Sequence, residues 1–234
     1  MSDPLPSTSA PATQADRSNV TDAVRVQILA TEHWSLLATR SMTWNEVFSR
    51  ASMFITVLSA AVVALALVAQ ATAFGPGFRV FALLVLPIVL LVGVATVIRL
   101  GDANSDDFLL VIGMNRLRHA YLELAPELEP YFSTAHHDDE ASVMLSYGLN
   151  QRLRLSRFLA GTPNLVAAIN IVVAGVLAAL IADTLGAPDV MDVVVGVIAA
   201  LAVAAGFGML AFRTIAAGRR AHHPRFPQKA AEPG

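Results

Sequence analysis

One stretch of the sequence decides the fold: residues 51–98, ASMFITVLSAAVVALALVAQATAFGPGFRVFALLVLPIVLLVGVATVI, contain a single charged side chain, Arg79. A charge at the centre of a bilayer costs roughly 2.5–3.5 kcal/mol, and about 20 apolar residues cross the ~30 Å of hydrocarbon. The stretch therefore predicts two membrane spans, near residues 53–73 and 79–99. Gly75-Pro76-Gly77 lies between them and predicts a tight hairpin turn.

A second pair of uncharged stretches, residues 158–182 and 193–212, predicts helices near 164–183 and 191–213. Leu185-Gly186-Ala187-Pro188 is the turn signal between them. The 234 residues are 55% hydrophobic and 15% charged, which is too apolar for a soluble domain of this length. We therefore predict an all-α integral membrane protein with four transmembrane helices in two hairpins and with cytoplasmic helical extensions.

The distribution of basic residues predicts the orientation. Of the 16 Lys and Arg residues, 15 lie in residues 1–50, 99–157 and 213–234, and Arg79 is the one basic residue beside a hairpin turn. Loops rich in Lys and Arg stay on the cytoplasmic side of a membrane. We therefore expect an inner-membrane, multi-pass protein whose N-terminus and C-terminus are both cytoplasmic, with the lipid bilayer as its first partner.

Composition and periodicity divide the chain into six segments. Residues 1–19 are rich in Ser, Thr, Pro and Ala and are expected to be disordered. The remaining segments are a cytoplasmic helix at 20–52, a transmembrane hairpin at 53–99, a cytoplasmic helical segment at 100–160, a second hairpin at 161–213 and a basic disordered tail at 214–234.

The apolar face of the helix at 20–52 allows two arrangements. It can pack against a second helix predicted at 106–124, as an antiparallel extension of the hairpin. Alternatively it can lie on the membrane surface, where Trp34 and Trp44 suit the interface. Acidic residues such as Glu46 dilute the basic face that a surface helix needs, and this favours the first arrangement.

A short run of potential metal ligands lies in the middle segment: His136, His137, Asp138, Asp139 and Glu140. Imidazole and carboxylate groups are suitable ligands for zinc or manganese. Adjacent residues point in different directions, however, and neither HxH nor HExxH is present. We therefore expect a solvated loop in which Asp138 or Asp139 caps the next helix, and we predict no metal or other cofactor.

Small residues recur every four positions on two of the spans. Such faces allow helix backbones to approach closely, either within one bundle or between the subunits of a homo-oligomer. The predicted packing residues are Ser52, Thr56, Ala60 and Ala64 on the first span and Gly196, Ala200, Ala204 and Gly208 on the fourth.

Several classes of function are disfavoured by what the sequence lacks. There is no cysteine, which excludes disulfides and thiol catalysis, and no ionisable residue falls in the central part of any span, where ion-coupled carriers place theirs. No catalytic motif is present, and we expect neither an enzyme nor a nucleic-acid partner. The leading hypothesis is a non-enzymatic membrane protein that presents a cytoplasmic helical module to a protein partner, for scaffolding or regulation.

The order of a long helix, a tight membrane hairpin and a further helix over residues 20–150 resembles the layout of the SLATT family of two-transmembrane effectors. The stretches TEHWSLLATRSMTWNEVFSR at 31–50 and GMNRLRHAY at 113–121 are similar to uncharacterised integral membrane proteins of actinobacterial genomes. The SLATT resemblance implies an alternative function, an oligomeric pore-forming or membrane-disrupting effector. It implies no particular site residue.

Overall fold

The computed structural model of the chain describes residues 21–148 and 161–228. All the regular elements in these two ranges are helices, which confirms the all-α prediction. Four of them are long and apolar enough to cross a membrane, and they form two hairpins as predicted. The predicted disordered start, residues 1–19, lies outside the described residues.

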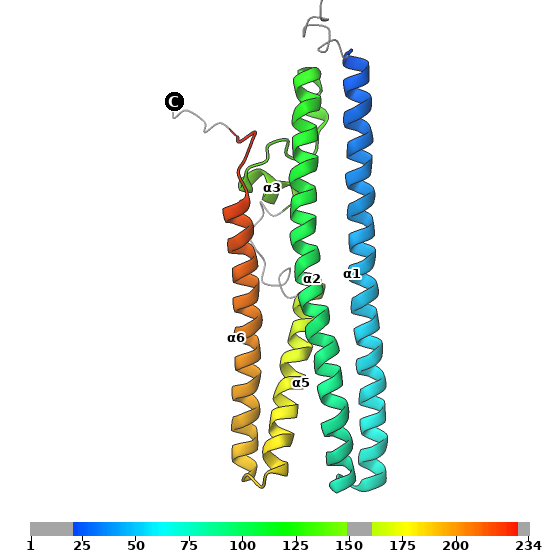
Figure 1. Cartoon of the computed structure of the whole chain (residues 1–234), viewed down its shortest axis with the longest axis vertical. Helices are drawn as coiled ribbons and strands as arrows, with labels where there is room; N and C mark the ends of the chain where they lie inside the picture. Colours follow the sequence, from blue (N-terminus) through cyan, green and yellow to red (C-terminus); the bar gives the residue numbers. More distant parts are fainter. Residues whose placement is uncertain (1–20, 149–160, 229–234) are drawn as a thin grey trace, which may run out of the picture.

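The first hairpin is built from two very long helices. Helix α1 runs unbroken over Asp22–Thr72 and helix α2 over Pro76–Leu124. At 1.5 Å per residue each is ~75 Å long, more than twice the thickness of the hydrocarbon. Each helix is therefore a membrane span and its extension in one piece, and α1 lies beside α2 along this length (Figure 1). The alternative in which residues 20–52 lie on the membrane surface is wrong.

The turn of this hairpin includes two residues other than glycine in an unusual backbone conformation. Ala73 and Phe74 both adopt the left-handed conformation, with φ of 45° and 58°. Gly75 precedes the first residue of α2, and a Cβ atom there would lie 2.8 Å from the carbonyl oxygen of Thr72. The glycine is needed for this close approach of two backbone segments, since its own φ is negative.

The second hairpin consists of α5, Thr162–Thr184, and α6, Asp189–Ala221. Its turn contains Gly186 with a φ of +82°. Helix α6 continues eight residues past the predicted end of the span at 213, and residues 222–228 then contact the middle segment. The structure differs here from the expectation of a disordered tail from residue 214.

Two short helices lie between the hairpins. The 3₁₀ helix η2 covers Pro126–Tyr131, and α3 covers Glu140–Ser146. Asp139 is the N-cap of α3, because its carboxylate accepts a hydrogen bond from the backbone N–H of Ser142 at 3.2 Å. The sequence-based expectation that Asp138 or Asp139 caps this helix is confirmed.

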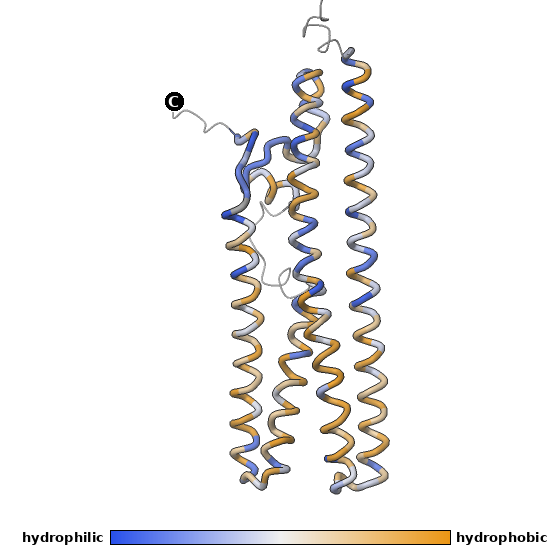
Figure 2. The backbone as a smooth tube through the Cα atoms, viewed as in Figure 1, coloured by the Kyte–Doolittle hydropathy of each residue, from blue (hydrophilic) through white to orange (hydrophobic). Residues whose placement is uncertain are grey.

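The long helices form a row in the order α1, α2, α5 and α6, with both hairpin turns at the same end (Figure 1). Figure 2 shows that apolar residues dominate the half that contains the turns and that polar residues gather in the other half. We call the polar half the extramembrane module; it comprises residues 22–50, 100–148 and 213–228.

Two hydrophobic clusters support this arrangement. The larger one joins α1, α2 and α5 and includes Phe54, Leu100 and Val166, each almost fully buried. The smaller one lies in the extramembrane module, where Ile112 and Met114 of α2 pack with Val143 of α3. The second cluster holds the short helix against α2 and so positions the polar residues described next.

Candidate functional site

The extramembrane module is organised around three buried polar side chains: Asp107, Asn115 and Asp138. All three lie on one side of α2 or on the segment that follows it. Burial of a polar group is costly unless hydrogen bonds replace those it made with water. The partners of each side chain therefore decide what this region can do.

Asp107 connects three helical elements. Its Oδ1 accepts hydrogen bonds from Arg40 Nε at 2.7 Å and from Trp44 Nε1 at 3.0 Å, both on α1. Its Oδ2 accepts from the hydroxyl of Tyr147, the residue after α3, at 2.6 Å. Burial and this hydrogen bond to Asp107 raise the pKa of the Tyr147 phenol, which therefore stays protonated as a donor.

Asn115 uses both ends of its amide. Its Nδ2 donates to the carbonyl oxygen of His137 at 2.8 Å, while its Oδ1 accepts from Arg118 Nη1 at 2.7 Å and from Ser146 Oγ at 3.0 Å. The side chain is fully buried. One residue on α2 thus holds both the segment before α3 and the last residue of α3.

Asp138 is a fully buried carboxylate that accepts three hydrogen bonds. Arg116 Nε donates to its Oδ2 at 2.7 Å, and the backbone N–H groups of Arg225 and Phe226 donate at 2.9 and 2.8 Å. Burial alone would raise the pKa of Asp138, but these hydrogen bonds more than compensate and hold the pKa below its ordinary value. Asp138 is therefore an ionised carboxylate that binds the C-terminal residues to α2.

Imidazole rings line one side of the same region. The Phe226 ring stacks on His119 with a centroid distance of 4.4 Å, and His136 and His137 lie 4.3 Å apart. Burial, then the neighbouring His137, lowers the pKa of His136, so that it stays neutral to lower pH than a free histidine.

The predicted metal-ligand run is brought together with the C-terminal residues rather than around a common point. Both carboxylates of Asp138 and Asp139 accept hydrogen bonds from protein donors, and Glu140 pairs with Arg219 of α6. In the ranges 21–148 and 161–228, no three His, Asp or Glu side chains are grouped as metal ligands would be. In this structure the run contacts Arg219 and residues 225–228.

The predicted packing residues of α6 are divided between a contact and an open face. Gly196 faces Gly175 of α5 so closely that a Cβ on either one would lie within 3.0 Å of a carbonyl oxygen of the other, and Ala200 joins this contact. Ala204 is half-buried, and the position of Gly208 is open, with no atom within 4 Å of a Cβ built there. The first part of the stripe is thus a helix contact within the chain.

The predicted packing residues of α1 face away from α2. The exposed members are Ser52, Thr56 and Ala60, whereas Ala64 is half-buried. The face that packs against α2 instead contains Ala51, Phe54 and Ala61. The stripe therefore contributes little to the packing of this chain, and the small residues on it are available to another molecule.

A polar contact between two helices lies within the apolar half. Asn170 of α5 is fully buried against Gly93 of α2, and a Cβ at Gly93 would lie 2.1 Å from its Oδ1. Asn170 Nδ2 donates to the carbonyl of Val166, and its Oδ1 has no hydrogen-bond partner among the described residues. The glycine hydrogen that replaces the Cβ faces this oxygen, as in a weak C–H···O contact. A lone Asn in a span signals such a contact, but the sequence does not identify its partner.

No protein-family model, no curated protein and no solved structure matches the chain. The functional argument therefore rests on the geometry above. Asp107, Asn115 and Asp138 are hydrogen-bonded to other groups of the chain, and these bonds tie α1, α2, α3 and the C-terminal residues into one unit. Such an arrangement is suited to holding a shape and presenting a surface.

Proposed function

We propose that this multi-pass membrane protein presents its extramembrane module on the cytoplasmic side of the inner membrane, for scaffolding or regulation of a protein partner, without enzymatic activity. The observation that carries this proposal is the hydrogen bonding of the buried Asp107, Asn115 and Asp138 side chains. Each of these buried side chains is hydrogen-bonded to another segment of the chain: Asp107 to α1, Asn115 to the loop before α3, and Asp138 to residues 225–226. Such a network makes the module rigid and so keeps the shape of its surface fixed.

The orientation is supported by charge and by topology together. Both hairpin turns lie at one end of the molecule, so the described polar segments lie at the other end (Figure 1). Among the described residues, ten basic residues lie in the polar half or at its boundary with the apolar half, and Arg79 is the one beside a hairpin turn. The positive-inside rule then assigns the polar half to the cytoplasm.

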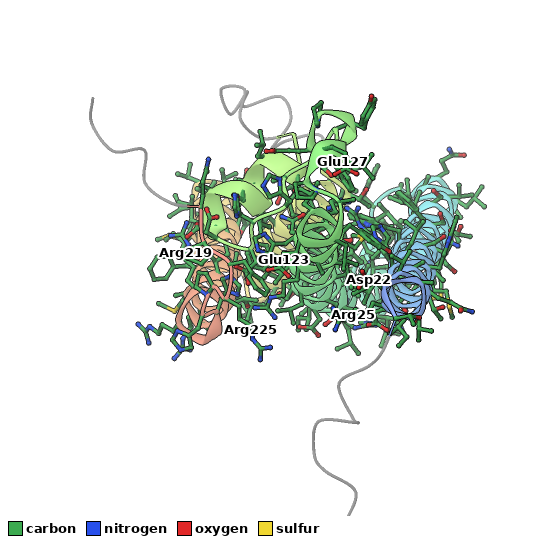
Figure 3. The ribbon with its side chains drawn as sticks, turned by 90° about the horizontal axis from the view of Figure 1, so that it is seen from above. Asp22, Arg25, Glu123, Glu127, Arg219 and Arg225 are labelled. Atoms are coloured by element: carbon green, nitrogen blue, oxygen red, sulfur yellow. The ribbon has the colours of Figure 1, made fainter. Side chains whose placement is uncertain are left out.

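A surface for a partner is present on α1. Trp34 and Met42 expose 71% and 73% of their surface, in the part of α1 that precedes the apolar span. Large apolar side chains exposed outside the bilayer are typical of protein interaction sites. Figure 3 shows the polar end of the molecule, with Asp22 and Arg25 on α1 and Glu127 on η2.

The test is site-specific photo-crosslinking in native membranes. A photoreactive residue at Trp34 or Met42 is expected to capture the same protein repeatedly, whereas one at the exposed Glu127 is the matched control and captures it less. Substitution of both residues, Trp34→Ala with Met42→Ser, should prevent co-purification of that protein. Reproducible failure to capture a common protein from the α1 positions would contradict the proposal.

The orientation can be tested separately, because the chain has no cysteine. A single cysteine at the exposed Glu123 should react with a membrane-impermeant maleimide in lysed cells and remain unlabelled in intact spheroplasts. Labelling in intact spheroplasts would place the module outside the cell and overturn the assignment.

The alternative is an oligomeric pore-forming or membrane-disrupting effector, and one observation favours it. Ser52, Thr56 and Ala60 form a small-residue face on α1 that no other part of the described chain covers. Overexpression with a membrane-potential dye separates the two functions, since an effector depolarises cells and a scaffold does not. If depolarisation occurs and Ala60→Leu abolishes it, the effector function replaces the proposal above.

A further inference from the structure

Residues 222–228, which we call the tail segment, lie across the loop before α3 as a bound peptide would. The backbone N–H groups of Arg225 and Phe226 both donate to the Asp138 carboxylate. In return, the carbonyl of Phe226 accepts from the backbone N–H of Asp138 at 3.3 Å. The contact therefore combines one main-chain hydrogen bond with two bonds from backbone N–H groups to a buried carboxylate, so it recognises the backbone of the tail segment.

The side chains add selectivity at two positions. Phe226 is half-buried, with its ring on His119, and His222 is half-buried, with its Nε2 placed 2.6 Å from the carbonyl oxygen of Asp138. The residues between them are exposed. Recognition thus depends on the backbone of Arg225 and on the rings of His222 and Phe226.

The sequence of the tail segment, HHPRFPQ, suits an extended bound form. Pro224 and Pro227 fix their own φ and disfavour the helical conformation of the residues before them. They also lack an N–H, so Arg225 and Phe226 supply the two donors that Asp138 accepts. A segment restricted in this way loses less conformational entropy when it binds.

The receiving side is built from buried or anchored groups. Asp138 is fully buried and is held by Arg116 of α2, and Asp139 accepts a further backbone hydrogen bond from Gln228 at 3.1 Å. Asn115 fixes the carbonyl of His137 beside them. These groups are positioned by α2 and α3 as well as by the tail segment.

We infer that Arg116, His119, His137, Asp138 and Asp139 form a binding site for an extended peptide that offers two consecutive backbone N–H groups and an aromatic side chain, and that the tail segment is its releasable intramolecular ligand. The inference rests on the proposed function, because it names the kind of partner segment that the module accepts. In the described structure the site is closed by the chain itself.

Tethering explains why the site stays closed. The tail segment follows directly on α6, so its local concentration at the site is that of a short tether, in the millimolar range. An external peptide of equal chemistry must therefore compete at millimolar concentration, unless the tail segment is prevented from binding. A variant that releases the tail segment should bind the same peptide at much lower concentration.

The experiment uses the full chain in nanodiscs and a dye-labelled synthetic peptide, HHPRFPQ, followed by fluorescence anisotropy. The double variant Arg225→Pro with Phe226→Ala removes one N–H donor and the aromatic ring from the resident segment. We expect it to bind the peptide at least tenfold more tightly than the wild-type chain. His223→Ala is the matched control: it keeps every backbone N–H and removes only an exposed side chain of the tail segment, and it should behave as the wild type.

A second measurement protects the test against misfolding. In the double-variant background, His119→Ala removes the ring under Phe226 without touching the Asp138 carboxylate, and it should weaken peptide binding at least fivefold. Equal binding to the wild type and the double variant, or no binding to the double variant, would overturn the inference. Neither result depends on capture of a cellular partner, so a failure here is distinguishable from a failure of the proposed function.

Discussion

The two halves of this molecule hold their helices together by different means. In the apolar half the closest contacts are made at glycines, which have no side chain to hold the neighbouring helix away. Examples are Gly175 with Gly196 and Gly93 with Asn170. In the extramembrane module, contacts between elements depend on the buried side chains of Asp107 and Asp138. Lipid supplies no hydrophobic force between helices, so close packing must act there. The surroundings of a helix pair therefore decide whether shape or hydrogen bonding fixes its register.

The largest effect is expected from Asp107→Ala. The change leaves Arg40, Trp44 and Tyr147 without their common acceptor, and removal of one partner of a buried ion pair typically costs 3–5 kcal/mol, so we expect a loss of about 3 kcal/mol. Thermal unfolding in detergent measures it. Asp106→Ala is the control, because Asp106 is exposed and its ion pair with Arg99 is long, with a distance of 3.9 Å between the charged atoms. Equal losses in the two variants would show that Asp107 does not organise the module.

The next effect concerns the apolar half. Gly93→Ala places a Cβ 2.1 Å from Asn170 Oδ1, and overpacking of this kind costs about 2 kcal/mol. Gly101→Ala, on the same helix with no atom within 4 Å of the new Cβ, is expected to leave the unfolding temperature unchanged or raised. Asn170→Ala should rescue Gly93→Ala, since it removes the clashing atoms. Without rescue, the cost arises elsewhere and the Gly93 contact is not the determinant.

A smaller effect is expected on α6. Gly196→Ala brings a Cβ within 2.8 Å of a backbone oxygen that cannot rotate away, so the hairpin must separate slightly, at a cost of about 1 kcal/mol. Gly208→Ala meets no neighbour and should be neutral. Unfolding temperatures of the two variants, measured in the same detergent, test whether the stripe on α6 packs within the hairpin along only part of its length.

The smallest effect is a pH dependence at the boundary between the halves. Hydrogen bonds from Arg99 and Arg50 lower the pKa of Glu46, which precedes the apolar span, from 4.5 to about 2. A carboxylate with a lowered pKa stabilises the fold above pH 4.5, and this contribution is lost as the pH falls toward 2. Glu46→Gln should flatten the fall of unfolding temperature between pH 5 and about 3. An unchanged pH profile would mean that these ion pairs add nothing.

Much of the architecture was accessible from the sequence because charges are excluded from spans. The uncharged stretches on either side of Arg79 and the two turn signals predicted helices and turns that the structure contains. The cap at Asp139 is also present. Apolar faces also predicted a helix beyond each span, at 20–52 and at 106–124, but the sequence analysis did not predict that α2 continues unbroken from its span into the second of these. These are local signals, which a single chain segment carries by itself.

The site was not accessible in the same way. Asp107 is 67 residues from Arg40, and Asp138 is 87 residues from Arg225, so nothing local distinguishes them from solvated surface charges. The small-residue stripe on α1 does not pack against another helix of this chain, for a related reason. A four-residue repeat identifies one face of a helix but does not show which face a neighbour will contact. In the structure the single neighbour, α2, contacts the face of α1 that carries the larger Phe54.

The unbroken hairpin of α1 and α2 also acts as a lever. About 30 residues of α1 stand beyond the apolar span, which at 1.5 Å per residue is an arm of ~45 Å. If the membrane part tilts by about 10°, as helices do when bilayer thickness changes, the far tip of this arm moves by roughly 8 Å. Trp34, which lies ~27 Å along this arm, would thereby move by roughly 5 Å when the lipid surroundings change.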